Sequence, residues 1–306
     1  MQRDIDRRQF LGHAAVATAA VSGSAQVASP LFGIEPIARN GQPKFKFSLA
    51  AYSYRDLLTG EPAELTLADF VDDCAQIGLE GTELTSYYFP QAVTDADLRA
   101  LKQHCFRLGL TVSGTAVGND FGFAPGAERD QQIASVKKWI DRAEILGAPV
   151  IRIFAGKQKK KQSPEVTHQL MVEGIEECCD YAGQHGVHLA LENHGGPTAT
   201  PEGLLRFVRD VRSPWFGVNL DTGNFYTEDP YGDLEKVAAY ALNVQVKVVT
   251  ALGEQRTDKR PTDFARLARM LREVNYRGFI VLEYEEGGDP RVECPKYVQQ
   301  VREAFA

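Results

Sequence analysis

Short apolar runs alternate with longer amphipathic segments from Phe45 to the end of the chain. The short runs are rich in Val, Ile, Leu and Phe, which is typical of strands that are buried on both faces. The longer segments repeat apolar residues at three- and four-residue spacing, as Leu67–Ile77 (LADFVDDCAQI) does, and this spacing predicts helices. The predicted strands are Phe47–Tyr52, Gly81–Leu84, Leu110–Thr115, Val150–Phe154, His188–Glu192, Phe216–Leu220, Val244–Val248 and Phe279–Glu283.

A predicted helix follows each predicted strand. Several of these helices end at a glycine that leads into the next strand, as in IGLEG and HGVH, which is typical of repeated β-α units. Eight such units in residues 41–306 predict a single-domain α/β protein, a closed (β/α)8 TIM barrel. An open doubly wound sheet is the alternative, but no G-x-G-x-x-G follows the first strand. The predicted helices are Leu67–Ile77, Asp95–Leu108, Arg129–Leu146, Thr167–His185, Pro201–Val211, Leu234–Tyr240, Asp263–Val274 and Pro290–Phe305.

The first 40 residues differ from the rest and predict an export signal with a linker. Arg7-Arg8-Gln9-Phe10-Leu11 precedes a weakly apolar stretch of small residues, Gly12–Ser24, and this order resembles a twin-arginine signal. An unstructured tail is the alternative. The segment is too short and too rich in alanine for stable membrane insertion. We therefore expect an exported, periplasmic protein.

The net charge and the cysteine content argue against some classes of partner and site. The chain of 306 residues has a net charge of −7, which argues against a nucleic-acid partner, since such partners require clustered positive charge. Its five cysteines show no framework spacing, so we expect buried thiols rather than disulfides or zinc ligands.

Polar residues gather where the predicted strands end, and in a TIM barrel this end carries the active site. Four acidic or amide side chains at one end of four consecutive strands would repel one another and lose hydration. A divalent cation removes this conflict, and an oxygen-rich ligand set favours Mn²⁺ or Mg²⁺, with Co²⁺, Zn²⁺ and Fe²⁺ as alternatives. The residues are Glu192 and His194 after the fifth strand, Asp221 and Asn224 after the sixth, Gln245 and Lys247 in the seventh, Glu283 ending the eighth, Glu83 ending the second and Arg152 in the fourth.

In the order of these residues along the strands, the chain resembles the sugar phosphate isomerase/epimerase family, which has a xylose-isomerase-like barrel. The resemblance implies a metal held by Glu192 in LALENH, Asp221 in LDTGN, Gln245 in VQVKV and Glu283 in VLEYE. One position departs from the family, which usually has His in an H-x-K arrangement where this chain has Gln245-Val246-Lys247. An amide oxygen is a weaker ligand than imidazole for transition metals, so the substitution favours harder ions.

The resemblance also implies chemistry at a carbon next to a carbonyl, through an enediolate. It implies that Glu192 and Glu283 exchange the proton with the substrate as well as binding the metal. The predicted substrate contacts are His194, Lys247, Glu83, Arg152 and Asn224. For Arg152 an ion pair with an acid on a neighbouring strand is the favoured alternative, and for His194 a helix-cap or core position remains open.

Four functions compete for this site. A metal-dependent isomerase or epimerase of a sugar or keto-sugar is the first, and a lyase that performs β-elimination on an oxidised (3-keto) glycoside is the second. A nuclease would require several zinc-binding histidines, and this chain has six His, most of them in the leader or in predicted helices. A non-catalytic sugar-binding barrel is the fourth. The expected partner is a small carbohydrate, and assembly into a homo-oligomer stays open.

Overall fold

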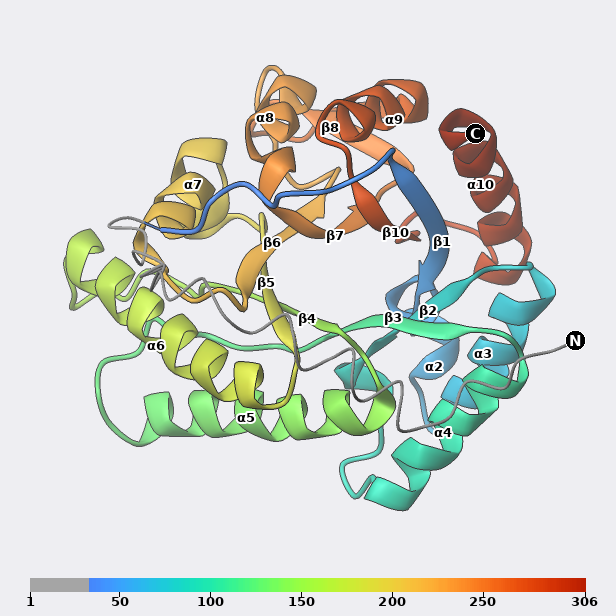
Figure 1. Cartoon of the computed structure of the whole chain (residues 1–306), viewed down its shortest axis with the longest axis horizontal. Helices are drawn as coiled ribbons and strands as arrows, with labels where there is room; N and C mark the ends of the chain where they lie inside the picture. Colours follow the sequence, from blue (N-terminus) through green and yellow to red (C-terminus); the bar gives the residue numbers. More distant parts are fainter. Residues whose placement is uncertain (1–32) are drawn as a thin grey trace, which may run out of the picture. The chain divides into compact units, whose positions relative to one another are not determined.

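A closed barrel of eight parallel strands forms the centre of the protein (Figure 1). The structure is a computed structural model that describes residues 33–306. Around the barrel the strands follow the order β1-β10-β7-β6-β5-β4-β3-β2, so every strand pairs with two neighbours. The barrel strands are β1 (Lys44–Ala50), β2 (Gly81–Thr85), β3 (Thr111–Ala116), β4 (Val150–Ile153), β5 (His188–Glu192), β6 (Phe216–Asp221), β7 (Ala241–Val246) and β10 (Arg277–Leu282).

Helices surround the barrel and cover its outer surface (Figure 1). Local signals in the sequence explain where several of them begin and end. Thr66 and Thr94 start α3 and α4 with capping boxes, since each side chain accepts from the backbone N–H three residues on. Gly147 ends α5 at a φ of 75°, a conformation that costs glycine little. The helices are α2 (Arg55–Leu58), α3 (Leu67–Gln76), α4 (Asp95–Arg107), α5 (Ala127–Leu146), α6 (Pro164–Gln184), α7 (Pro201–Asp210), α8 (Pro230–Val237), α9 (Phe264–Glu273) and α10 (Pro290–Phe305).

The predicted fold class is confirmed, and the predicted elements differ from the observed ones at their ends. The first strand ends at Ala50 rather than Tyr52, because Ala51–Tyr54 turns into a 3-10 helix. The sequence places Glu83 at the end of the second strand, and this is wrong, since β2 continues to Thr85. A register shift between Thr82 and Glu83 accompanies the change, so Glu83 lies deeper in the barrel than predicted.

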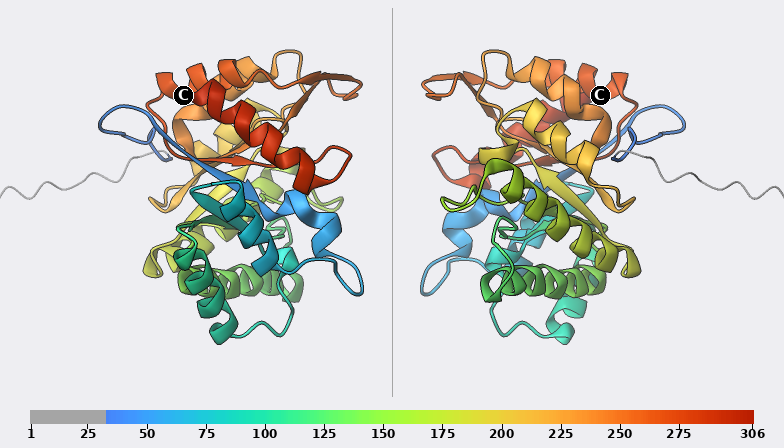
Figure 2. Two further views of the ribbon diagram at one scale, coloured as in Figure 1. Left: turned by 90° about the vertical axis from the view of Figure 1, so that its right-hand side faces the viewer. Right: turned by 90° about the vertical axis from the view of Figure 1, so that its left-hand side faces the viewer.

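An antiparallel hairpin that the sequence analysis did not predict follows the seventh barrel strand. It consists of β8 (Val249–Leu252) and β9 (Asp258–Pro261) and has its own two-stranded sheet. Figure 2 shows the hairpin projecting from the body of the barrel. Val249 begins three residues after β7 ends, so the hairpin stands at the carboxyl end of the barrel.

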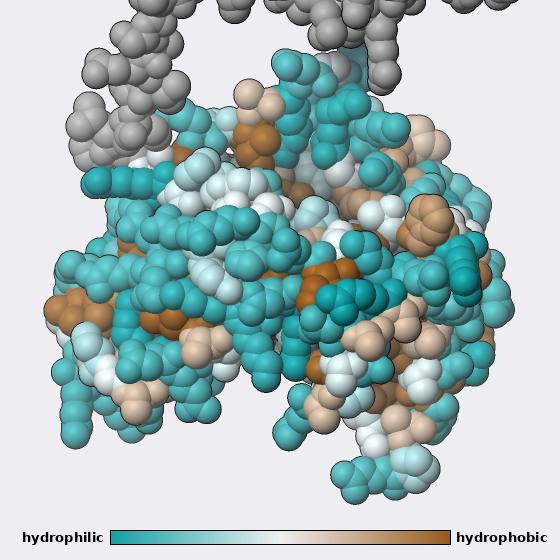
Figure 3. All heavy atoms as spheres, turned by 60° about the horizontal axis from the view of Figure 1, so that its bottom comes forward, coloured by the Kyte–Doolittle hydropathy of each residue, from teal (hydrophilic) through white to brown (hydrophobic). Residues whose placement is uncertain are grey.

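The interior of the barrel and the layer beneath the helices form one hydrophobic core. All five cysteines are buried and free, as predicted. On the side of α4 and α5 the surface is mainly hydrophilic, with hydrophobic side chains in small separate groups (Figure 3). Within residues 33–306 no helix is long and apolar enough to cross a membrane. The predicted export signal falls on residues outside those that the structure describes.

Candidate active site

Carboxylates meet at the carboxyl end of the barrel, as the sequence predicted. Glu192 is the last residue of β5, Asp221 is the last residue of β6, and Glu283 directly follows β10. Each of the three is at most 6% exposed. Gln245 and Lys247 come from the end of β7 and lie on one face, because alternate residues of a strand point the same way.

Lys247 lies at the centre of this group and contacts three carboxylates. Its ammonium nitrogen is 2.7 Å from Glu283 Oε2, 3.1 Å from Glu285 Oε2 and 3.4 Å from Asp221 Oδ2. The first contact is a hydrogen bond that Lys247 donates. Asp221 Oδ2 accepts no hydrogen bond from the described residues, although the ammonium lies within ion-pair distance. Lys247 therefore provides the positive charge that holds these carboxylates together.

Arg152 balances the charge of Glu192 on the other side of the group. The guanidinium Nε lies 2.9 Å from Glu192 Oε2, and both side chains are buried. This contact joins the neighbouring strands β4 and β5, so the predicted ion pair of Arg152 is confirmed. Asn224 donates to the other carboxylate oxygen, Glu192 Oε1, at 2.9 Å.

Below these carboxylates, four buried side chains form a closed ring of hydrogen bonds. Gln245 donates to Glu83 Oε1 at 2.7 Å and accepts from Asn219 at 2.6 Å. Asn243 donates to Asn219 and to Glu83 Oε2, at 2.9 Å each, and this closes the ring. An ionised carboxylate only accepts hydrogen bonds, so the amide nitrogen of Gln245 faces Glu83 when Glu83 is ionised. The oxygen of Gln245 is thereby held against Asn219. We call these four residues the amide ring.

Burial raises the pKa of several acids at this end of the barrel. It raises the pKa of Glu83 to about 7, and the Glu283 carboxylate adds to the rise. The pKa values of Glu192 and Asp221 are also raised, chiefly by burial, with Arg152 and Lys247 opposing the rise. Because four buried carboxylates face two buried cations, the group keeps an excess of negative charge that favours binding a proton. Carboxyls of this kind are suited to proton transfer near neutral pH.

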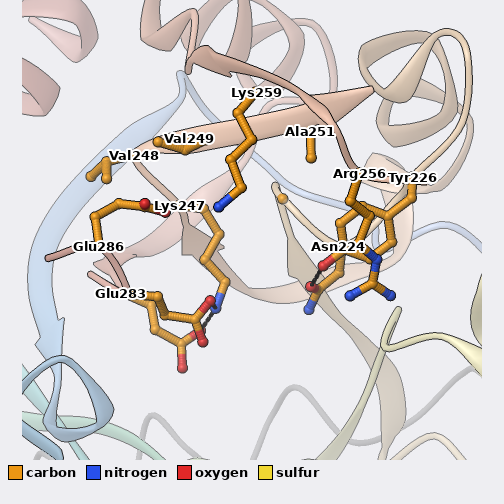
Figure 4. A pocket seen from close by; sticks show the side chains of 12 residues that line it. Asn224, Tyr226, Lys247, Val248, Val249, Ala251, Arg256, Lys259, Glu283 and Glu286 are labelled. Atoms are coloured by element: carbon orange, nitrogen blue, oxygen red, sulfur yellow. Dashed lines mark hydrogen bonds and ion pairs between the residues drawn. The ribbon is translucent and has the colours of Figure 1, made fainter. Parts of the chain in front are cut away.

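A pocket of about 170 Å³ opens onto this group (Figure 4). Asn224, Lys247 and Glu283 line it from the barrel side. The hairpin covers another side: the Arg256 guanidinium lies 3.5 Å from the centre of the Tyr226 ring, and Lys259 extends into the pocket (Figure 4).

Of the predicted site residues, Asn224, Lys247 and Glu283 line this pocket, and the other six do not line it. His194 is exposed and lines a different pocket, where its ring centre is 4.6 Å from that of Phe154. Glu83 is part of the amide ring and does not line the pocket with Lys247. The structure thus brings together Glu192, Asp221, Asn224, Lys247, Glu283 and Arg152, places Gln245 and Glu83 in the amide ring beside them, and leaves His194 at a neighbouring pocket.

Sequence reasoning missed residues whose signals were nevertheless present. Asn219 and Asn243 stand two residues before Asp221 and Gln245 on the same strands, so alternation places each pair on one face. Glu285 stands two residues after Glu283, and it is the third carboxylate at Lys247. By contrast, nothing in the sequence indicated that Arg256 and Lys259 of the hairpin would reach this pocket.

The side chain of Asn193 links the end of β5 to the end of β6. Its side chain donates to the Asp221 backbone oxygen and accepts from the Asp221 backbone N–H, at 2.9 Å each. These two bonds tie the end of β5 to the end of β6. They fix Glu192 and Asp221, the residues that the two strands carry to the site.

The four residues predicted to bind a divalent metal do not form a ligand set in this arrangement. The oxygen of Gln245 accepts from Asn219, the oxygens of Glu192 contact Arg152 and Asn224, and the ammonium of Lys247 lies against the remaining carboxylates. Among the described residues, no group of three or more His, Cys, Asp or Glu side chains is arranged to hold a metal ion. In this arrangement Arg152 lies against Glu192 and Lys247 lies against Glu283, two of the carboxylates predicted to bind the metal.

The chain matches a known family and several solved structures. Residues 71–304 match the family model described as xylose isomerase-like TIM barrel. The 3-dehydroshikimate dehydratase of Bacillus anthracis is 22% identical over 215 residues, which cover 67% of this chain and 72% of that protein.

Two solved structures share the fold at low sequence identity. The D-psicose 3-epimerase of Clostridium cellulolyticum H10, solved with D-tagatose, has a TM-score of 0.69 at 16% identity, over 85% of this chain and 99% of its own. A xylose isomerase domain protein of Planctomyces limnophilus has a TM-score of 0.67 at 19% identity, over 86% of this chain and 98% of its own.

Proposed function

Because this chain belongs to the xylose isomerase-like TIM barrel family, we propose that it is an isomerase or epimerase of a small polyhydroxylated ketone, such as a keto-sugar. In this proposal the enzyme removes a proton from the carbon next to the carbonyl and returns it to another face or another carbon. The divalent metal that the sequence predicted has no part in the proposal, since the residues present do not form its ligand set.

One observation carries the proposal: buried carboxylates surround a buried ammonium group at the wall of a pocket. Glu283 and Lys247 line the pocket directly, and Asn224 connects it to Glu192. The raised pKa of Glu192 favours a group that accepts a proton from carbon and gives it back, because a general base works best near the operating pH. A sugar-binding protein without catalytic activity would have no need of a carboxylate with a raised pKa.

The reaction step uses residues of this chain only. Glu192 or Glu283 takes the proton as the C–H bond breaks, and the electron pair moves onto the carbonyl oxygen to give an enolate. Returning the proton to the opposite face gives the epimer, and returning it to the neighbouring carbon, after transfer of a hydroxyl proton, gives the isomer. Nothing is oxidised or reduced overall. A hydrogen-bond donor at the enolate oxygen contributes on the order of 10²–10³-fold in rate at sites of this kind.

The test is solvent exchange observed by proton NMR in D₂O, with a panel of ketopentoses and ketohexoses. The wild-type protein should wash deuterium into the position next to the carbonyl of one of them and produce its epimer or isomer. Glu192→Gln and Glu283→Gln should each abolish exchange while the circular dichroism spectrum is kept. Glu64→Gln, in an exposed loop, serves as the matched control. Full exchange in the Glu192 and Glu283 variants would contradict the proposal.

A β-elimination is the second candidate, and similarity to a dehydratase supports it. After the same proton abstraction, a hydroxyl or glycosyl oxygen on the next carbon is protonated and leaves, and a carbon–carbon double bond forms. The product is a conjugated enone, which absorbs in the near ultraviolet. Incubation of the protein with β-hydroxy ketones and with 3-keto glycosides separates the two candidates: absorbance or released aglycone favours elimination, and an epimer favours the first. If the predicted export signal acts, substrates without phosphate are favoured.

A further inference from the structure

The position of Lys247 suggests a role that goes beyond balancing charge. We propose that the Lys247 ammonium, held by Asp221, Glu283 and Glu285, replaces a divalent cation as the electrophile of this site, so that the reaction is independent of metal. This inference rests on the proposed function for its chemistry, but its central claim concerns which cation the carboxylates hold. That claim can be measured on its own.

The geometry around Lys247 is that of a cation enclosed by its ligands. Three carboxylates from two elements lie within 3.4 Å of the nitrogen. The Lys247 side chain is 10% exposed, and those of Asp221 and Glu283 are 0% and 8% exposed. The ammonium donates a hydrogen bond to Glu283 and lies within ion-pair distance of Asp221 and Glu285. A divalent ion at this position would have to share these carboxylates with the Lys247 ammonium, which already contacts all three.

The amide ring is a second and independent observation. A metal at this position would take the oxygen of Gln245 as its fourth ligand, but this oxygen faces Asn219. Rotating the amide would set its oxygen against the Glu83 carboxylate and its nitrogen against the amide nitrogen of Asn219. Both new contacts are repulsive, and each buried polar group without a partner costs about 1–3 kcal/mol. The ring therefore keeps Gln245 from serving as a ligand.

The third observation is the pair between Arg152 and Glu192. Glu192 would be the first metal ligand, but its two oxygens contact Arg152 Nε and Asn224 Nδ2, each at 2.9 Å. The positive charge of Arg152 already balances this carboxylate. Two cations of the protein, Arg152 and Lys247, thus share the carboxylates that one metal ion would hold.

The contacts also show how Lys247 would reach the substrate. Glu285 is the least buried of its three partners, with a side chain that is 40% exposed. A carbonyl oxygen that enters the pocket can displace Glu285 and accept the N–H that it releases, while Asp221 and Glu283 keep the ammonium in place. The enolate oxygen then forms against a fixed positive charge. The negative charge that develops there is stabilised without any reorganisation of water.

The test compares metal binding by the wild-type protein and by Lys247→Met in the full chain. We expect the purified wild-type protein to carry far less than one equivalent of metal by plasma mass spectrometry. EDTA should leave its melting temperature and its proton exchange unchanged. Lys247→Met should bind Mn²⁺ more tightly in calorimetry, by roughly a factor of ten or more, because a positive charge about 4 Å from the ion is removed. Lys138→Met, on an exposed face of α5, is the matched control.

Two results would overturn the inference. One is a stoichiometric metal in the wild-type protein whose removal lowers the melting temperature. The other is an unchanged Mn²⁺ affinity in Lys247→Met, with a circular dichroism spectrum that shows a folded variant. If no substrate is turned over at all, the proposed function fails while the binding comparison still decides which cation the carboxylates hold.

Discussion

Replacing Gln245 with Glu would test the amide ring with minimal change in size. The substitution exchanges the nitrogen that donates to Glu83 for an oxygen, at a contact of 2.7 Å. Two carboxyls at this distance cannot both be ionised in a buried site, so one proton must be held between them. With that proton present, the ring keeps every hydrogen bond, since the introduced carboxyl can still accept from Asn219.

The size of the effect follows from proton linkage. An ordinary Glu has a pKa of 4.5, and the folded variant holds one more proton than the unfolded chain above that pH. A carboxyl whose pKa is raised in the folded state loses its stabilising contribution as pH rises, by about 1.4 kcal/mol per unit. Wild-type Glu83, whose pKa is about 7, already holds a proton over most of this range, so the variant loses stability relative to the wild type mainly above pH 7, by about 1.4 kcal/mol at pH 8.

Urea unfolding at pH 5, 6.5 and 8 measures this slope. Gln103→Glu, on the exposed face of α4, adds the same charge without a buried neighbour and should show little pH dependence. A loss of stability in Gln245→Glu that is equal at all three pH values would refute the ring as described.

Two further substitutions test the contacts around Glu192. Arg152→Met should lower the stability of the fold by about 3–5 kcal/mol and raise the pKa of Glu192 further, because it leaves a buried carboxylate without its cation. Urea unfolding measures the first effect, and the pH profile of proton exchange measures the second. An unchanged pH profile would contradict the ion pair between Arg152 and Glu192. Asn193→Ala removes two buried hydrogen bonds to Asp221 and should lower the free energy of unfolding by about 3 kcal/mol. A calorimetric melting temperature equal to that of the wild type would show that these bonds do not hold the strand ends together.

The barrel could be predicted from the sequence because its signals are local. Strand and helix periods, and acids at the ends of strands, follow from neighbouring residues, and Glu192 and Asp221 stand at the ends of β5 and β6 as expected. The partners of Gln245 could not be predicted in this way. Glu83 lies 162 residues earlier in the chain, and a register shift on β2 determines which height in the barrel it reaches.

The contacts of Lys247 could not be predicted from the sequence either. Alternation placed it on the same face as Gln245, but a sequence gives charges without distances. Only the structure shows that its ammonium is 2.7 Å from Glu283, close enough to compete with a metal ion. The hairpin was missed because β9 (DKRP) is exposed along its length and lacks the alternation that marks a half-buried strand.

The amide ring has a consequence for how this sequence can evolve. Around a closed ring, every donor faces an acceptor, so exchanging one member leaves its two neighbours mismatched. An imidazole in place of Gln245 would have to satisfy Glu83 and Asn219 together, at angles that suited an amide. Homologues should therefore covary at positions 83, 219, 243 and 245, and those with His at 245 should differ at one or more of the other three. A change from Gln to His at position 245 would then need a second substitution in the amide ring, and homologues with only one of the two changes would be rare.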